Sequence, residues 1–164
     1  MKIIKLLSTL LFISFAIISC NDDDSNIDKP KDVNYADLTN KKFILVSAIS
    51  ELPLDTNNDG ISDRDIYKQM LPCEVDNIYE FYDNERFILD ENSNICQGKS
   101  QTMTGRWIKS GSTGIIMYDQ NGKEIEMFQD IVLKKENNKI IMLYYRYWNI
   151  NNNIIKVEYK LQEK

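Results

Sequence analysis

The C-terminal segment alternates between apolar and polar residues with a period of two. Ile155, Val157, Tyr159 and Leu161 fall on one side of an extended chain, and the charged residues between them fall on the other. Successive side chains of a β-strand point to opposite faces, so this pattern is typical of a half-buried antiparallel strand. With seven earlier apolar stretches, the sequence predicts about eight strands, over residues 43–48, 78–82, 86–89, 105–109, 114–118, 124–134, 139–148 and 154–161.

Short polar turns connect consecutive predicted strands. Asn121-Gly122 lies in one of them and is a strong hairpin signal, because both residue types tolerate positive φ. Asp83-Asn84, Asn137-Asn138 and the Asn-rich residues 149–153 mark three more turns. Strands joined in this way pair with their neighbours, and eight of them usually close into a barrel without exposed edges. The sequence therefore predicts an all-β, up-and-down antiparallel barrel of about eight strands.

One short helix is predicted in the long connection after the first strand. Ser62 and Asp65 have the spacing of a capping box, with Asp where Glu or Gln is usual. Residues 66–71 would then form about two helical turns. Pro72 is expected to end this helix, because proline has no backbone N–H to donate.

The N-terminal residues 1–19 have the layout of a secretory signal peptide. Lys2 and Lys5 precede an apolar run that ends at Ile18-Ser19, directly before Cys20. This junction resembles the lipobox of bacterial lipoproteins, which implies that the Cys20 thiol is lipidated and becomes the new N-terminus. A transmembrane helix is one alternative, although the run is short of about 20 apolar residues. A signal peptide cleaved at a non-lipid site is the other, although the small-x-small pattern is poor.

Residues 20–37 are predicted to form the lipidated Cys20 and a flexible acidic tether. The run Asn21-Asp22-Asp23-Asp24-Ser25 carries like charges and few apolar side chains, so it cannot bury enough surface to fold. It resembles the surface-export signal of lipoproteins from the Bacteroidetes, which implies an outer membrane lipoprotein exposed at the cell surface. A plain solvated linker is the alternative. Residues 38–164 remain as a single barrel domain.

Charge and composition exclude several functions. The formal charge of −5 becomes −7 without residues 1–19, which carry two lysines and no acid, so a nucleic-acid partner is not expected. The chain has no histidine, which removes the usual general base and the usual metal ligand. No spacing singles out a pair of carboxylates for glycosidase chemistry. We therefore expect a protein that is not an enzyme.

Cys73 and Cys96 remain once Cys20 is assigned to lipid. In an exported domain two such cysteines pair more often than not, and the loop closed by the bond spans 23 positions. Closing it stabilises the fold by about 3 kcal/mol in the chain-entropy model. Two free buried thiols are the alternative.

Several short motifs occur in an order that resembles one family. Phe43-Ile44-Leu45-Val46-Ser47 opens the domain, an Asp/Asn/Gly loop with a short helix and Cys73 follows, and then come Ile78-Tyr79-Glu80-Phe81, Cys96 and Gly105-Arg106-Trp107. In this order they resemble the lipocalin-like domain lipoproteins of Bacteroidetes, although a Trp is common in that family where Phe43 stands. The resemblance implies a small calycin-like barrel with an unknown ligand and no catalytic residues.

The loop after the first strand contains a candidate calcium site. Asp55, Asn57, Asp59 and Asp63 offer side-chain oxygens at alternate positions, Ile61 offers its carbonyl, and Gly60 stands at the sixth position. Ile66 replaces the bidentate Glu at the twelfth position, so the loop is closer to dockerin or thrombospondin type 3 loops and predicts weak Ca²⁺ binding, about 10⁻⁴ to 10⁻³ M. The alternative is a turn without metal.

Residues 140–148 are aromatic and bulky on both faces of the predicted strand. Tyr144, Arg146 and Trp148 share one face, and in a barrel this face would line the lumen, where these residues are candidate ligand contacts. Arg146 could orient an anionic or lipid headgroup, or cap the barrel by stacking on Trp107. The alternative is that these side chains simply fill the interior.

Together these patterns predict a lipid-anchored, exported, lipocalin-like barrel that binds a small apolar or amphipathic ligand without catalysis. The membrane is its expected partner through the lipid anchor. The alternative is a structural or protein-interaction module of the cell envelope with a filled core, whose protein partner the sequence does not identify. The binding function is inferred from the fold by analogy.

Overall fold

The structure, a computed structural model, describes residues 33–164. The predicted signal peptide, Cys20 and the acidic run after it lie outside the described residues. The elements are η1 (Tyr35–Asp37), β1 (Lys41–Leu54), β2 (Asp63–Asp65), η2 (Ile66–Gln69), α1 (Pro72–Val75), β3 (Ile78–Phe81), β4 (Arg86–Asp90), β5 (Thr102–Ser110), β6 (Gly114–Asp119), β7 (Glu124–Glu136), β8 (Lys139–Ile150) and β9 (Asn153–Glu163).

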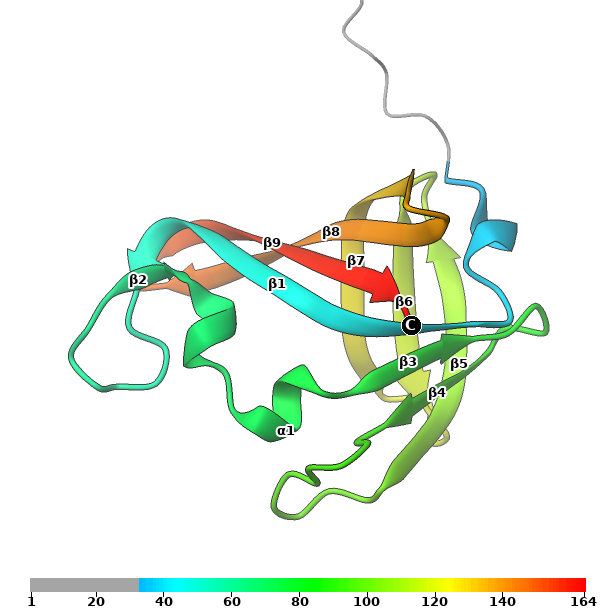
Figure 1. Ribbon diagram of the computed structural model, residues 1–164, viewed down its shortest axis with the longest axis horizontal. Helices are drawn as coiled ribbons and strands as arrows, with labels where there is room; N and C mark the ends of the chain where they lie inside the picture. Colours follow the sequence, from blue (N-terminus) through cyan, green and yellow to red (C-terminus); the bar gives the residue numbers. More distant parts are fainter. Residues whose placement is uncertain (1–32) are drawn as a thin grey trace, which may run out of the picture.

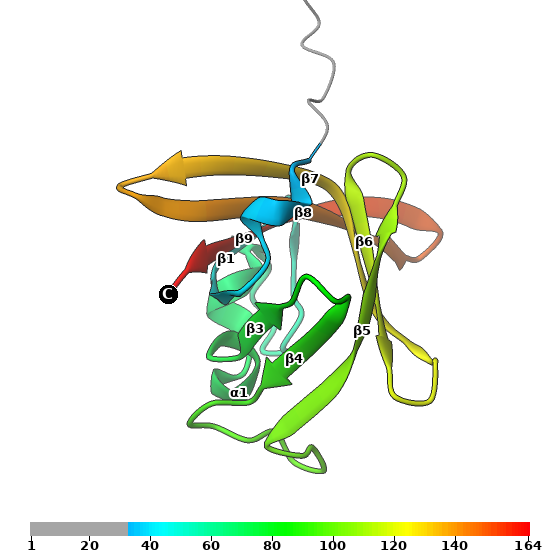
Figure 2. The same cartoon turned by 90° about the vertical axis from the view of Figure 1, so that its right-hand side faces the viewer.

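Eight strands form one closed antiparallel barrel (Figures 1 and 2). Strands β3 to β9 pair in sequence order, and β1 closes the sheet by pairing with both β3 and β9. Phe43 of β1 thus lies opposite Tyr79 of β3 and Glu163 of β9. The predicted all-β, up-and-down barrel of about eight strands is confirmed. The short β2, which the sequence pattern does not predict, pairs with the second half of β1.

Alternating side chains of each strand fill the interior. Ile155, Val157, Tyr159 and Leu161 of β9 are at most 5% exposed, as their period-two pattern predicts. The intervening lysines and glutamate of β9 are partly exposed. Burial of such a face provides the main favourable free energy of the fold, at about 25 cal/mol per Å² of apolar surface. The largest fully buried side chains include Phe43, Phe81, Phe87, Phe128 and Tyr144.

Asparagine shapes the tight turns of the last hairpins. Asn137 and Asn138 both have positive φ between β7 and β8, as have Asn151 and Asn152 between β8 and β9, which is the backbone of a two-residue hairpin turn. The turn at Asn121-Gly122 differs from the prediction, because Gly122 has positive φ and Asn121 does not. The Asp119 carboxylate organises this longer turn by accepting hydrogen bonds from the backbone N–H groups of Asn121 and Lys123.

A β-bulge bends β7 across the barrel. The register between β7 and β8 shifts between Gln129 and Val132, and Asp130 there has φ of 50°. An extra residue of this kind increases the local twist of a strand. The first part of β7 therefore pairs with β6 and its second part with β8, so that β8, β9 and β1 cross β5 to β7 in Figure 1.

The connection between β1 and β3 contains a short helix, but not at the predicted position. Residues 66–69 form the 3₁₀ helix η2, Asp63–Asp65 pair with β1 as β2, and the predicted capping box at Ser62 is therefore absent. Pro72 begins the helix α1 instead of ending one. The first helical position suits proline, because its φ is already helical and the N–H it lacks would have no partner there. The connection still holds one short helix, as predicted for this part of the chain.

The disulfide between Cys73 and Cys96 is confirmed, with a Cα–Cα distance of 5.2 Å. It joins α1 to the loop between β4 and β5. Asp76 reinforces the same junction, because its Oδ2 accepts hydrogen bonds from the backbone N–H groups of Ser93 and Asn94. The insertion after β1 is therefore held to the body of the barrel at its far end.

The folded domain begins earlier than residue 38. Val33 and Tyr35 belong to the core and Tyr35 opens η1, so the boundary expected after residue 37 lies at or before Val33. Tyr35 and Leu38 lie against one end of the barrel interior. Among residues 33–164, no helix is long and apolar enough to cross a membrane.

Candidate functional site

Aromatic side chains fill the end of the barrel that carries η1, which we call the packed end. The ring centroid of Phe81 lies 6.0 Å from that of Trp107 and 6.3 Å from that of Phe128. Tyr35 Oη donates a hydrogen bond to the Gly114 carbonyl, and Trp107 Nε1 donates to the Tyr82 carbonyl. Since the polar atoms of both rings have acceptors, these rings are buried at little cost. A hollow of about 540 Å³ borders Tyr35 and Trp107 at the same end.

A pocket of about 650 Å³ lies at the opposite end, where β1 and β8 run on beyond the packed core. This volume falls within the range of pockets that hold small ligands, about 300 to 1,000 Å³. One part of its wall is apolar. This part is formed by Leu54 of β1, Ile66 and Met70 from the connection after β2, and Trp148 and Ile150 of β8.

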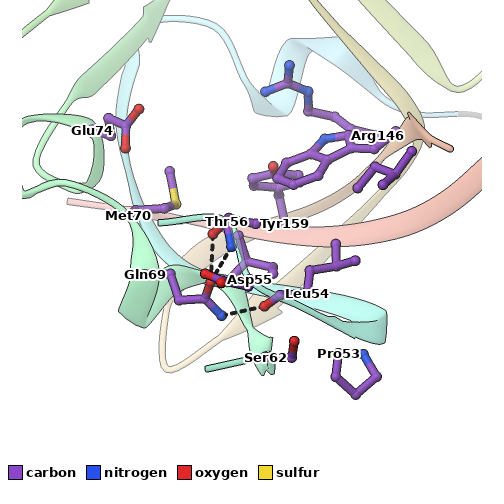
Figure 3. A pocket seen from close by; sticks show the side chains of 13 residues that line it. Pro53, Leu54, Asp55, Thr56, Ser62, Gln69, Met70, Glu74, Arg146 and Tyr159 are labelled. Carbon is purple, nitrogen blue, oxygen red and sulfur yellow. Dashed lines mark hydrogen bonds between the residues drawn. The ribbon is translucent and has the colours of Figure 1, made fainter. Parts of the chain in front are cut away.

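The remaining wall carries polar side chains from several elements (Figure 3). Arg146 comes from β8, Tyr159 from β9 and Glu74 from α1, while Thr56 and Gln69 come from the connection after β1. An apolar wall with a few polar groups is the usual composition of a site that fixes the orientation of an amphipathic ligand.

An ion pair lies at the base of the pocket. Arg146 Nη1 is 3.2 Å from Glu126 Oε1, and the Glu126 side chain is 13% exposed whereas that of Arg146 is 41% exposed. The guanidinium also lies over the ring of Tyr159, with Cζ 5.7 Å from the ring centroid. Glu126 is thus held inside the barrel, and Arg146 stands between it and the pocket.

Burial governs the titration of the side chains at the base of the pocket. It raises the pKa of Glu126, although Arg146 and a hydrogen bond from Tyr144 favour the carboxylate. Burial likewise raises the pKa of Tyr159 to about 12 and that of Tyr144 well above its usual value. Both tyrosines therefore remain neutral at physiological pH. Arg146 is the cation of this group and Glu126 its buried anion.

The connection after β1 is fastened beside the pocket by Gln69 (Figure 3). Its Oε1 accepts hydrogen bonds from the backbone N–H and the hydroxyl of Thr56, at 2.7 and 2.8 Å, and its Nε2 donates to the Leu54 carbonyl at 2.9 Å. Both the carbonyl oxygen and one N–H of this amide thus hold η2 to the end of β1 and the residues after it. The disulfide fixes the other end of the connection, so the wall is built before a ligand arrives.

The three lumen residues predicted from β8 all face the interior, but in different surroundings. Arg146 and Trp148 line the pocket. Tyr144 is 1% exposed and stacks between Phe128 and Tyr159, with ring centroids at 3.8 and 5.1 Å. Tyr144 therefore belongs to the filling of the barrel. The predicted stacking of Arg146 on Trp107 is wrong, because Trp107 lies at the packed end and Arg146 lies over Tyr159.

The predicted calcium loop is organised by its own hydrogen bonds. Asp55 Oδ1 accepts from the Asp59 backbone N–H and Oδ2 from that of Gly60, while Asn57 Nδ2 donates to Asp59 Oδ2. Asp63 lies outside this turn, because it is the first residue of β2. The Ile61 side chain is exposed to solvent. Within residues 33–164, no three or more His, Cys, Asp or Glu side chains are grouped to hold a metal ion. Calcium binding stays a prediction.

Sequence reasoning missed Glu74 and Gln69, which line the pocket, and Glu126, which pairs with Arg146 behind it. Glu126 is the clearest case, because Ile125 and Met127 beside it suggest that the glutamate points to solvent. The useful signal was Phe128, which lies two positions further along β7 and is fully buried on the same face. No sequence pattern marks Glu74 as facing the pocket, since α1 is only four residues long.

No protein family, no curated protein and no solved structure matches this chain. The family resemblance described above therefore stays a prediction, and the site is interpreted from its own geometry.

Proposed function

We propose that this protein is a lipid-anchored, lipocalin-like binding barrel of the outer membrane that holds one small amphipathic ligand without catalysis. The supporting observation is the pocket of about 650 Å³, whose wall combines apolar side chains with Arg146 and Tyr159. Its apolar wall suits the body of the ligand, and Arg146 and Tyr159 suit a polar head.

The position of the two tryptophans provides a test. Trp148 lines the pocket, whereas Trp107 is 3% exposed at the packed end. The chain from residue 20 onward with Cys20→Ser keeps every described residue and lacks the lipid. A ligand taken from a lipid extract should add its mass in native mass spectrometry and change the fluorescence of Trp148.

Two single-tryptophan variants separate specific from general binding. Trp107→Phe should keep the fluorescence change, and Trp148→Phe should lose it while keeping the native circular dichroism spectrum. A bare protein mass after exposure to the extract, with no change in fluorescence, would instead support a scaffold that acts through protein partners.

A further inference from the structure

Two opposite charges reach the pocket from different elements. Arg146 extends from β8 and Glu74 from α1, and Figure 3 shows their charged groups on different sides of the same space. The pKa of Tyr159 reflects both: burial raises it first, Arg146 lowers it, and the negative charge of Glu74 adds a smaller increase. The tyrosine hydroxyl therefore lies within the field of both charged side chains.

Arg146 keeps donors for a ligand. A guanidinium has five N–H donors and no acceptor. Glu126 takes one N–H of Arg146, and Tyr159 shares a further hydrogen bond with it. With the Arg146 side chain 41% exposed toward the pocket, further N–H groups can reach an anionic group that enters. Bidentate binding of carboxylate or phosphate is the usual role of such an arginine.

Glu74 is the acidic counterpart on the opposite side. Its Oε2 accepts one hydrogen bond, from the Leu71 backbone N–H at 2.9 Å, and among residues 33–164 no lysine or arginine forms an ion pair with it. The neighbouring Cys73 is bonded to Cys96, so the disulfide fixes the helix that presents Glu74. Glu74 is exposed, so water can solvate its carboxylate, and an ammonium group in the pocket would give it a cationic partner.

We propose that the pocket selects a zwitterionic amphiphile, with its anionic group on Arg146, its ammonium group on Glu74 and its hydrocarbon part against Leu54, Met70 and Trp148. This inference rests on the proposed binding function and adds the class of ligand. A purely anionic head would meet Glu74 as a like charge, and a purely cationic head would meet Arg146. Repulsion of this kind gives a site its selectivity as much as attraction does.

Three probes with matched hydrocarbon chains test the selection. At pH 7, 2-aminododecanoic acid carries both charges, dodecanoic acid carries only the negative one and dodecylamine only the positive one. Titration calorimetry on the Cys20→Ser chain from residue 20 should show the zwitterion binding about ten-fold more tightly than either singly charged probe.

Charge-removing variants assign each head group to its residue. Glu74→Gln keeps an acceptor for the Leu71 N–H and should weaken 2-aminododecanoic acid and dodecylamine about ten-fold, while dodecanoic acid, relieved of the like charge, should bind at least as tightly as before. Glu136→Gln is the matched control, because it removes one exposed negative charge at the far end of β7 and should change none of the three affinities.

Arg146 is tested without leaving a lone buried charge. The double variant Glu126→Gln/Arg146→Gln removes the whole ion pair and should weaken 2-aminododecanoic acid and dodecanoic acid about ten-fold, while dodecylamine should bind at least as tightly as before. The single variant Glu126→Gln keeps the Arg146 charge but removes the partner that positions it, so it should weaken the zwitterion less than the double variant does. Circular dichroism checks that each variant is folded.

The outcomes separate this inference from the proposed function. If dodecanoic acid binds as tightly as the zwitterion and Glu74→Gln changes neither, the pocket binds amphiphiles but the role of Glu74 is refuted. If none of the three probes gives heat or changes Trp148 fluorescence, both the inference and the proposed function are overturned.

Discussion

Arg146 Nη1 lies 3.2 Å from Glu126 Oε1, which joins a half-exposed cation on β8 to a nearly buried carboxylate on β7. Removing one partner of such a pair leaves the other uncompensated, whereas replacing both can be nearly neutral. Glu126 has the poorer access to water, and burial raises its pKa despite Arg146. The ion pair therefore positions Arg146 beside the pocket, while the Glu126 carboxyl group remains costly to ionise.

The raised pKa of Glu126 predicts a specific pH dependence of stability. The folded state holds its proton more tightly than the unfolded state, so this residue lowers the free energy of unfolding as pH rises from about 4.5 through the folded pKa. Glu126→Gln should remove that slope. Urea unfolding at pH 4, 5, 6 and 7 should show the wild type losing stability relative to the variant as the pH rises over this range.

Other carboxyl groups do not obscure this comparison. Asp90, for example, has a lowered pKa because the Asn92 backbone N–H donates to it, so its contribution to stability is lost as pH falls. This contribution has the opposite sign and is the same in both proteins. Stability curves of wild type and Glu126→Gln that stay parallel from pH 4 to 7 would contradict the predicted role of Glu126.

The barrel could be predicted from the sequence because its strands obey local rules. The alternation of Ile155 to Leu161 and the asparagine pairs at 137–138 and 151–152 fix the faces and the turns of neighbouring strands. The insertion could not be predicted in the same way. Pro72 suits both the end and the start of a helix, and β2 is a three-residue strand that exists because β1 extends beside it.

The pocket was less predictable, since it depends on which parts of the interior remain unfilled. Trp107 and Trp148 are both inward-facing aromatics in sequence terms, yet one packs against Phe81 and the other lines the cavity. Glu126 breaks the hydrophobic alternation of β7, and only the closed sheet reveals that it faces inward opposite Met117. Long-range strand pairing decides both the surroundings of the two tryptophans and the inward direction of Glu126.

Gly105 of β5 should tolerate no side chain. A Cβ built there would lie 1.9 Å from the Tyr118 carbonyl oxygen and 2.6 Å from Phe87 Cε1, and both neighbours belong to paired strands. Gly105→Ala should therefore lower the free energy of unfolding by about 3 kcal/mol, measured by urea denaturation. Thr102→Ala on the same strand is exposed and should cost at most about 0.5 kcal/mol. Equal stabilities of the two variants would show that the sheet opens to accept the methyl group.

Calcium titration tests the loop from Asp55 to Asp63. The calcium interpretation predicts heat of binding at about 10⁻⁴ to 10⁻³ M Ca²⁺, and its loss in Asp59→Asn, which removes a ligand charge. The alternative, a turn closed by its own hydrogen bonds, predicts no heat for either protein at millimolar calcium. Magnesium at the same concentration serves as a control for general ionic effects.

The predicted membrane anchor depends on Cys20. If its thiol carries lipid, Cys20→Ser should move the protein from the membrane fraction to the soluble fraction, because two acyl chains hold a protein at the bilayer far better than polar contacts do. Intact-mass measurement of the wild type should show the added lipid. A Cys20→Ser protein that stays with the membranes would favour an uncleaved apolar anchor over residues 1–19.

The Cys73–Cys96 bond should stabilise the fold by restricting the unfolded chain. Its loop spans 23 positions, which corresponds to about 3 kcal/mol in the chain-entropy model. Urea unfolding with and without reductant should differ by about that amount for the wild type, while Cys73→Ser/Cys96→Ser should resemble the reduced protein under both conditions. Because the bond also fixes α1, the double variant should bind 2-aminododecanoic acid less tightly and dodecanoic acid unchanged. Full affinity for both probes would mean that Glu74 is positioned by its bond to Leu71 alone.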